Sequence, residues 1–496
     1  MIFINSSSKD SFKIFQSFSP IFVPFGIGYL MATLDRNNIK SYYVDEVFEK
    51  DAFEKILEIC KNINKPYIFG FNVLTVSYKN ALILSVKLKN KFPESIVVFG
   101  GIHSTMMPEE SLLNDTVDIV VRGEAENIIV DLFNCLKRRN YPTQLNGISY
   151  KSGGKIIHNS ENFNQVRLSE LPEFPYKYFE NNNYNLGYVM TARGCPYNCI
   201  FCSKISRSSN VRFMEKTQVL DNLEILYEKY NIKHVGFLDD DFLCNQNRVY
   251  DLCELLRSSK LYNKMTFSFA ARADNCNAEV LKMMYSSGFR SVFLGFETAS
   301  EDIMKSLKKG EKLTSVIEAI KVVKNANLSV STNFIFGLPG ENREVRRKAF
   351  KYAKDLKLDL VKYNNATPFP GTELYNIAVA ENRLNVVGKY ENFLATAVLT
   401  ENPFKKIRIP FVPKGNTENQ IRYDILFGTF IFYFNFRRLK YIFTKQDLSN
   451  SWYYFGKNAK ELSKNIFKIL ILFVILFIKF SEMLILYPFL SKNRNR

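Results

Sequence analysis

Two runs of alternating strands and helices, separated by one polar stretch, restrict this chain to a small set of folds. In residues 1–150, short apolar segments alternate with stretches whose apolar residues recur three and four positions apart. The predicted strands are residues 2–5, 40–44, 67–73, 96–99, 117–121 and 148–151. This order predicts an α/β domain with a doubly wound, flavodoxin-like parallel sheet, which binds ligands at the carboxyl ends of its strands.

The second run begins at residue 186 and extends to residue 400. Its predicted strands are residues 187–191, 234–238, 265–270, 291–296, 330–336 and 360–364, each followed by a helical stretch. Six such units are two short of a closed barrel, so we expect an open, partial (β/α)6 TIM-like barrel with its chemistry on the loops after the strands. Residues 151–185 are polar and interrupted by Gly and Pro, which predicts a linker.

The C-terminal region, residues 401–496, is aromatic and basic and is predicted to be mainly helical. Its longest uncharged run in the last apolar stretch, residues 469–478, is about half of the roughly 20 residues that cross a bilayer. Lys464, Lys468, Lys479 and Glu482 fall near one helical face, which suits a helix on a surface. Three arrangements stay open: a helix packed on the barrel, an interfacial membrane helix, and a tilted span with snorkelling lysines.

The composition predicts a cytoplasmic protein with packed cores. Apolar residues make up 46% of the chain, eight cysteines are too few for a disulfide framework, and residues 1–15 do not resemble a signal peptide. The net charge is +18, which attracts anionic partners in general. No basic run interleaves with aromatic residues as in a nucleic-acid groove, so we expect no nucleic-acid partner.

Three of the eight cysteines lie within "RGCPYNCIFCS", directly after the first predicted barrel strand. Thiolate clusters select zinc or iron–sulfur centres. No second Cys or His pair with zinc spacing follows Cys195, Cys199 and Cys202. Three thiolates are also one fewer than the usual four ligands of a 4Fe-4S cluster, and an iron without a protein ligand can bind a substrate or cofactor.

The segment "CPYNCIFC" resembles the CxxxCxxC signature of radical S-adenosylmethionine (radical SAM) enzymes, including the aromatic residue before the last cysteine. "FLDDDF", "AARAD", "GFETAS", "FGLPGE" and "TPFPGTELY" are similar to segments of that superfamily, each at a predicted strand end. The resemblance implies a 4Fe-4S cluster on the three cysteines and S-adenosylmethionine on the open iron. It implies cofactor contacts from Phe201, Asp239, Asp240, Glu297, Gly337 and Pro339. Taken singly, each segment also fits a structural role: a helix cap, a turn, or a partner of Arg272 such as Asp274 or Glu297.

The first domain resembles the cobalamin-binding domain that precedes the barrel in one radical SAM class. The similar segments are "FVPFGIGYLMATL", "VFGGIHSTMMPEESL" and "VDIVVRGEAE". The resemblance implies cobalamin contacts from Gly100, Gly101, His103 and Ser104. The D-x-H-x-x-G motif of other cobalamin proteins does not occur, so no histidine is expected to ligate cobalt. The alternatives are a tight turn in a domain without ligand and a histidine that serves the core.

Together these resemblances cover about residues 1–400 and imply a cobalamin-dependent radical SAM enzyme that methylates an unactivated carbon. The expected partners are a small-molecule, lipid or peptide substrate and an electron donor such as flavodoxin or ferredoxin. Two alternatives stay open: a radical cyclase or oxidase acting on a lipid or porphyrin-like substrate, and a non-catalytic cobalamin sensor. Peripheral association with the inner membrane face through the C-terminal region is a further open expectation. No individual catalytic residue is identified.

Overall fold

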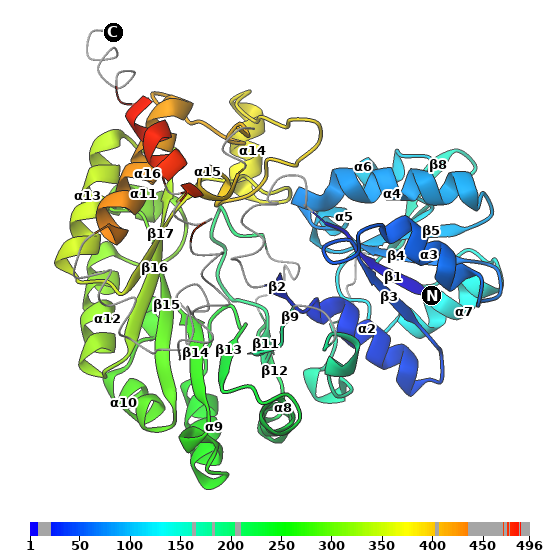
Figure 1. Cartoon of the computed structure of the whole chain (residues 1–496), viewed down its shortest axis with the longest axis horizontal. Helices are drawn as coiled ribbons and strands as arrows, with labels where there is room; N and C mark the ends of the chain where they lie inside the picture. The colour runs from blue at the N-terminus through cyan, green and yellow to red at the C-terminus, as the bar shows by residue number, and fades with distance from the viewer. Residues whose placement is uncertain are drawn as a thin grey trace.

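The computed structural model describes residues 1–7, 21–160, 165–180, 184–203, 210–401, 406–434, 470, 474–475, 477–485 and 487. Two sheets form its framework, each covered by helices (Figure 1). The first sheet has the order β3-β1-β4-β5-β6-β7-β8. Its strands are β1 (Ile2–Asn5), β3 (Tyr42–Asp45), β4 (Ile68–Asn72), β5 (Ile96–Gly100), β6 (Ile119–Val121), β7 (Ile148–Ser152) and β8 (Lys155–His158). The first five are mutually parallel, and the order reverses at β1, as in flavodoxin-like folds.

Helices cover both faces of the first sheet, as predicted. They are α2 (Phe25–Arg36), α3 (Ala52–Cys60), α4 (Tyr78–Lys91), α5 (Ile102–Met106), α6 (Pro108–Leu112) and α7 (Ile129–Lys137). α2 and α7 pack on one face, where Met31 and Leu132 meet Phe3. α3 and α4 pack on the other face, where Ile56 and Leu88 join a separate core cluster.

Much of the predicted linker packs against the folded domains. β8 pairs antiparallel with β7, so the first sheet continues to His158. Beyond it, apolar side chains are buried in the main core together with Tyr29 of α2; they belong to Val166, Leu168, Leu171, Phe174, Tyr176 and Phe179. The polar composition of the whole stretch hid these apolar residues, whose burial packs the segment firmly against both neighbours.

The second sheet confirms the open barrel. Its six parallel strands follow sequence order: β10 (Tyr188–Val189), β13 (His234–Phe237), β14 (Thr266–Ala271), β15 (Phe289–Glu297), β16 (Ser329–Phe336) and β17 (Leu360–Asn365). Outside them lie α8 (Lys216–Glu228), α9 (Gln246–Ser258), α10 (Ala278–Ser286), α11 (Glu301–Ser306), α12 (Leu313–Asn325) and α13 (Arg343–Asp355) (Figure 1). Two short pairs were not predicted: β2 (Ile21–Phe22) with β9 (Tyr184–Asn185), and β11 (Ala192–Arg193) with β12 (Arg212–Phe213).

The C-terminal region covers the open edge of this barrel. α14 (Glu373–Ala380) and α15 (Ala397–Thr400) precede it, and its helix α16 (Glu418–Tyr433) packs against α13 and β17. The Tyr433 hydroxyl accepts a hydrogen bond from the Val361 N–H at 3.2 Å and donates one to the Val361 carbonyl at 2.7 Å. The tyrosine thereby satisfies backbone groups that an edge strand otherwise leaves unpaired.

A last helical segment, residues 477–485, packs on α16, where the rings of Phe480 and Phe430 lie 4.5 Å apart. Among the described residues, no helix is long and apolar enough to cross a membrane. Lys464 and Lys468, two of the charges predicted to lie on one helical face, fall outside the described residues. Lys479 and Glu482 are buried and face the barrel region, contrary to a solvent-facing polar side.

Replacement of Tyr433 by phenylalanine tests how much the edge depends on this hydroxyl. The Val361 N–H would remain buried without a partner, so we expect Tyr433→Phe to lower the free energy of unfolding by about 1–3 kcal/mol in urea titrations. The matched control is Tyr141→Phe, because the Tyr141 side chain is 61% exposed; its expected change is within about 0.5 kcal/mol. Equal values for the two variants would contradict this role of Tyr433.

Candidate functional site

A cavity of about 440 Å³ lies between the carboxyl ends of the first sheet and the first strands of the barrel. Its walls include Gly26, Asn72, Gly100 and Gly101 from the first domain. From the barrel they include Met190, Ala192, Arg193, Gly194, Ser203, Leu238 and Asp240. The volume lies within the range of small-molecule sites, about 300–1,000 Å³. The cavity ends beside the cysteine loop, because Gly194 and Ser203 flank the segment from Cys195 to Cys202.

Several glycines line the first-domain wall, among them Gly26, Gly100 and Gly101. Gly101 has φ +91°, and a Cβ there would lie 2.7 Å from Asn72 Oδ1 and 2.8 Å from Val73 N, so the tight turn after β5 requires glycine. Gly26 differs, because a Cβ there would meet no atom within 4 Å. A larger side chain at Gly26 would therefore extend into the cavity. Such a wall suits close approach of a large ligand to the backbone, and cobalamin fits this description.

The four residues predicted to contact cobalamin separate into two pairs. Gly100 and Gly101 line the cavity, whereas His103 and Ser104 do not and are fully buried. The His103 ring packs against Tyr78 and Tyr390, with centroids 4.2 and 4.9 Å apart.

The His103 ring is held as an uncharged core side chain. Among the described residues, neither ring nitrogen has a hydrogen-bond partner, and the nearest carboxylate oxygen, of Glu110, is 3.9 Å from Nε2. Burial, reinforced by the charge of Lys389, lowers the pKa of His103 to about 3. The ring therefore packs the first domain against the segment after α14 in its neutral form.

Ion pairs connect the first domain to the cysteine loop. Arg193 Nη2 lies 2.7 Å from Glu126 Oε1, and Arg212 Nη2 lies 2.6 Å from Glu124 Oε1. Both arginines belong to the β11–β12 pair, and both carboxylates belong to the "VRGEAE" segment. Sequence comparison identified that segment as part of a ligand-binding domain, but its carboxylates hold the strand that leads into Cys195.

Backbone contacts fix the middle of the cysteine loop. The Ile200 N–H donates to the Leu307 carbonyl at 3.0 Å, and the Ile200 carbonyl accepts from the Leu374 N–H at 2.9 Å. The guanidinium of Arg272 stacks 3.4 Å above the ring of Tyr197 and is itself held by Asp274. The suggested pairing of Arg272 with Asp274 is thus correct, and its additional effect is to hold the aromatic residue between the first two cysteines.

The three thiols fit an iron–sulfur cluster by their chemistry. In the part of the chain that the structure describes, no three His, Cys, Asp or Glu side chains lie close enough to hold one metal ion, so the thiols share a loop without converging. None of them forms a disulfide. Burial raises the pKa of Cys199, while the nearby charges of Lys309 and Arg272 act in the opposite direction. Three cysteines on one loop, with the cations of Lys309 and Arg272 near Cys199, are a suitable donor set for such a cluster.

A buried polar group lies at the end of β15. Glu297 has φ +63°, which is unfavourable for a residue with a side chain. Its carboxylate accepts from Asn333 Nδ2 at 2.8 Å and lies 3.5 Å from Lys309 Nζ, which also pairs with Glu311 at 2.8 Å. Burial raises the pKa of Glu297, with Lys309 opposing the shift. Sequence reasoning selected Glu297 but missed Lys309, because "KKGEK" has the appearance of an ordinary surface charge run.

The remaining predicted S-adenosylmethionine residues have distinct surroundings. Asp239 is buried and accepts hydrogen bonds from the N–H groups of Thr191 and Ala192 at 2.7 and 2.8 Å, so it holds the chain before the cysteine loop. Asp240 is exposed and lines the cavity. Phe201 packs in the same cluster as Leu338, which lies between Gly337 and Pro339. The structure thus brings the cysteine loop together with the "GLPG" turn.

Comparisons with known proteins agree with this geometry. Residues 189–353 match the radical SAM superfamily, and residues 14–133 match the B12 binding domain. The chain is 32% identical to an uncharacterized methyltransferase, PH0819, of Pyrococcus horikoshii, over 73% of this chain and 79% of that protein. It is 25% identical to the anaerobic magnesium-protoporphyrin IX monomethyl ester cyclase of Cereibacter sphaeroides, over 71% of this chain and 60% of that enzyme.

A solved structure has the same fold. The cobalamin-dependent S-adenosylmethionine radical enzyme OxsB with aqua-cobalamin bound superimposes with a TM-score of 0.69 at 17% identity. The superposition covers 98% of this chain and 72% of OxsB.

A size series at Gly26 tests whether the cavity holds cobalamin. Gly26→Leu should extend a side chain into the cavity without straining the helix, so we expect cobalamin affinity to fall by at least about tenfold, a loss of about 1.4 kcal/mol. Gly26→Ala is the matched control, because it adds only a methyl group, and its affinity should stay near that of the wild type. The measurement is a cobalamin titration followed by visible absorbance. Equal affinities for the two variants would place cobalamin elsewhere.

His103→Phe tests the packing role of His103. Because the folded pKa of about 3 lies below the ordinary value of 6.5, the unfolded chain binds the proton more tightly, and the wild type loses stability as the pH falls from 6.5 toward 3. Between pH 7 and pH 5 this loss is about 2 kcal/mol and should be absent in His103→Phe when urea unfolding is measured. A folded His103→Phe variant that no longer binds cobalamin would instead show a ligand contact.

Proposed function

The chain belongs to the cobalamin-dependent radical SAM methyltransferase family, and from this premise we propose that it methylates an unactivated carbon of its substrate. One observation carries the proposal. The cavity of the cobalamin-type domain opens beside the cysteine loop, with Arg193 and Gly194 lining it immediately before Cys195. A methyl donor in the cavity and a radical source at the loop would therefore act on the same substrate.

Named residues would hold each cofactor. Cys195, Cys199 and Cys202 would ligate the 4Fe-4S cluster, and Gly26, Gly100 and Gly101 would contact cobalamin. When bound, the cluster and S-adenosylmethionine supply a 5'-deoxyadenosyl radical, and cobalamin supplies the methyl group. Asp240 and Glu297 are the carboxylates that we propose for contacts to S-adenosylmethionine, and Phe201, Gly337 and Pro339 are the proposed apolar and backbone contacts. Asp239 would act indirectly, through the chain that precedes the cysteine loop.

The main contribution of the protein side chains is to hold the cysteine loop and its neighbouring strands in place. Arg193 and Arg212, paired with Glu126 and Glu124, support the strand pair beside the loop. Arg272 supports Tyr197 from the opposite side. Because a radical reacts with whatever lies near it, such fixed geometry protects the enzyme from side reactions and selects the substrate carbon.

We propose the following partners and location. The substrate would be a small molecule, a lipid or a peptide, and the electron would come from a donor such as flavodoxin or ferredoxin. The enzyme would act in the cytoplasm and associate peripherally with the inner face of the membrane. The buried orientation of Lys479 and Glu482 supports this last point, because it leaves the apolar side of their helix outward.

The two other functions have less support. A cyclase activity is suggested by the named activity of the Cereibacter sphaeroides relative, which is 25% identical. A cobalamin sensor would need neither the cysteine loop nor the buried groups Glu297 and Lys309 at the barrel end.

Turnover with labelled S-adenosylmethionine tests the proposal. The reconstituted protein is incubated anaerobically with methyl-labelled S-adenosylmethionine, a reductant and an extract of the source cells, followed by mass analysis. We expect a labelled product together with 5'-deoxyadenosine, and loss of both to background in Cys199→Ala. 5'-Deoxyadenosine without transferred label would favour a cyclase or oxidase. Cobalamin binding without iron or 5'-deoxyadenosine would favour a sensor.

A further inference from the structure

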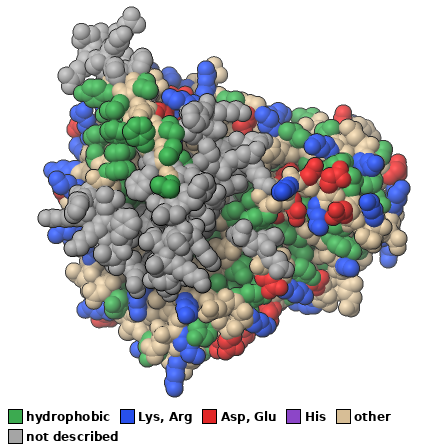
Figure 2. All heavy atoms as spheres, in the orientation of Figure 1, with side chains coloured by type: hydrophobic (Ala, Val, Ile, Leu, Met, Phe, Trp, Pro, Cys, Tyr) green, Lys and Arg blue, Asp and Glu red, His purple; other side chains and the backbone are tan. Residues whose placement is uncertain are grey.

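The last helical segment and the described residues on either side of it present apolar side chains to solvent. Between 54% and 69% of each of six side chains is exposed; we call them the outer patch, and they are Leu470, Val474, Phe477, Leu484, Ile485 and Tyr487. Most are three, four or seven positions apart, which is the spacing of one helix face. Figure 2 shows hydrophobic side chains gathered over this part of the molecule. A contiguous apolar face of this kind usually marks a contact with a partner or a membrane.

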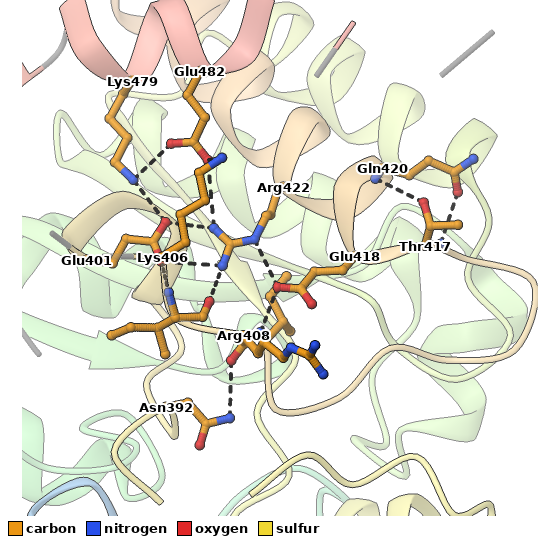
Figure 3. Close-up of polar contacts among 12 residues, drawn as sticks. Asn392, Glu401, Lys406, Arg408, Thr417, Glu418, Gln420, Arg422, Lys479 and Glu482 are labelled. Atoms are coloured by element: carbon orange, nitrogen blue, oxygen red, sulfur yellow. Dashed lines mark hydrogen bonds and ion pairs between the residues drawn. The ribbon is translucent and has the colours of Figure 1, made fainter. Parts of the chain in front are cut away.

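The opposite side of the same helix is buried and charged. Ile475, Lys479, Glu482 and Met483 are each at most 7% exposed. Lys479 Nζ lies 3.1 Å from Glu401 Oε1 and 3.3 Å from Glu482 Oε2 (Figure 3). The two charged residues of this helix thus lie on its buried side, whereas the charges of a surface helix usually face water.

The charges that the helix meets are themselves fixed by the fold. Arg422 of α16 is buried, with Nη1 2.7 Å from Glu401 Oε1 and Nε 3.0 Å from Glu418 Oε1 (Figure 3). Lys406 Nζ lies 3.3 Å from Glu482 Oε1. Three cations and three carboxylates thus form one network of balanced charge.

This network determines which side of the helix faces outward. Rotation of the helix to bury Phe477 and Ile485 would carry Lys479 and Glu482 away from Glu401 and Lys406. Glu401 and Arg422, which are at most 3% exposed, would lose part of their charge compensation. An uncompensated buried charge is costly, so the apolar face stays outward in the free protein.

Exposed basic residues lie on the neighbouring helix. Arg347, Lys348 and Lys351 are exposed on α13, which packs against α16, and Lys406 is half-exposed. Lys and Arg side chains lie at the margins of the hydrophobic area in Figure 2. The sequence of residues 401–496 holds 17 Lys and Arg against 6 Asp and Glu. Apolar side chains next to exposed basic residues match a bilayer with anionic headgroups, whereas a second copy of this chain would bring like charges together.

We propose that the outer patch docks this enzyme on the surface of an anionic lipid bilayer, with Phe477 and Ile485 entering the acyl boundary and α13 facing the headgroups. The inference extends the proposed peripheral association and does not depend on the methyl-transfer chemistry. It implies that binding needs both apolar contact and negative lipid charge, because each contribution alone gives only marginal attachment.

Vesicle flotation of the full-length, cofactor-loaded protein tests this surface. We expect flotation with vesicles of equal parts phosphatidylcholine and phosphatidylglycerol, and little with phosphatidylcholine alone. Phe477→Ser combined with Ile485→Ser should lower the floated fraction by about tenfold. The matched control is Leu113→Ser, because Leu113 is 76% exposed on the first domain, away from the patch; it should float like the wild type.

Several results would overturn the proposal. Equal flotation of the double variant and the wild type would exclude the outer patch, and equal flotation on neutral vesicles would exclude the charge requirement. Patch-dependent dimers in sedimentation without lipid would assign the surface to self-association. Cobalamin content and 5'-deoxyadenosine formation, measured on the same samples, should be unchanged in the double variant, which separates failure of docking from failure of the proposed chemistry.

Discussion

The ion pairs of Arg193 with Glu126 and of Arg212 with Glu124 join the first domain to the barrel, and the site lies between these two domains. All four side chains are largely buried, so they attract each other more strongly than surface pairs do. They hold the strand before Cys195 against the loop after β6, and the cavity lies beside these ion pairs. Loss of either carboxylate would leave a buried arginine with less compensation and the cysteine loop with less support.

A second set of contacts holds the cysteine loop inside the barrel, and it uses residues that sequence comparison associates with cofactor binding. Asp239 accepts hydrogen bonds from the N–H groups of Thr191 and Ala192, and the Arg272 guanidinium stacks on the Tyr197 ring. Similarity to a family motif therefore does not distinguish a residue that touches a cofactor from one that orients the loop. Both roles constrain residue type equally, because a catalytic loop needs supporting contacts as much as it needs ligands.

The sequence allowed the strands of both sheets, the fold class and the crowding of Cys195, Cys199 and Cys202 to be predicted, because periodicity and spacing are local properties. Roles that depend on distant neighbours were not accessible. Lys309 is buried where Glu297 and the Gly295 carbonyl, both from β15, join the nearby Glu311 around its ammonium group. His103 follows a family motif, yet its ring packs with Tyr390, which lies 287 positions away in the sequence. The burial of the apolar residues within 165–180 was likewise hidden by the polar composition of their neighbours.

The C-terminal helix is the clearest case in which burial depends on residues distant in the sequence. Helical spacing groups Lys479 and Glu482 correctly on one face, but a pattern of charges cannot tell whether that face meets water or other charges. Glu401 and Arg422 determine that the charged face is buried, since their own burial requires charged partners from the helix. Once the charged face is turned inward, the apolar face has no place in the core and must lie outside. The outward apolar surface is thus a direct consequence of how the fold compensates its buried charges.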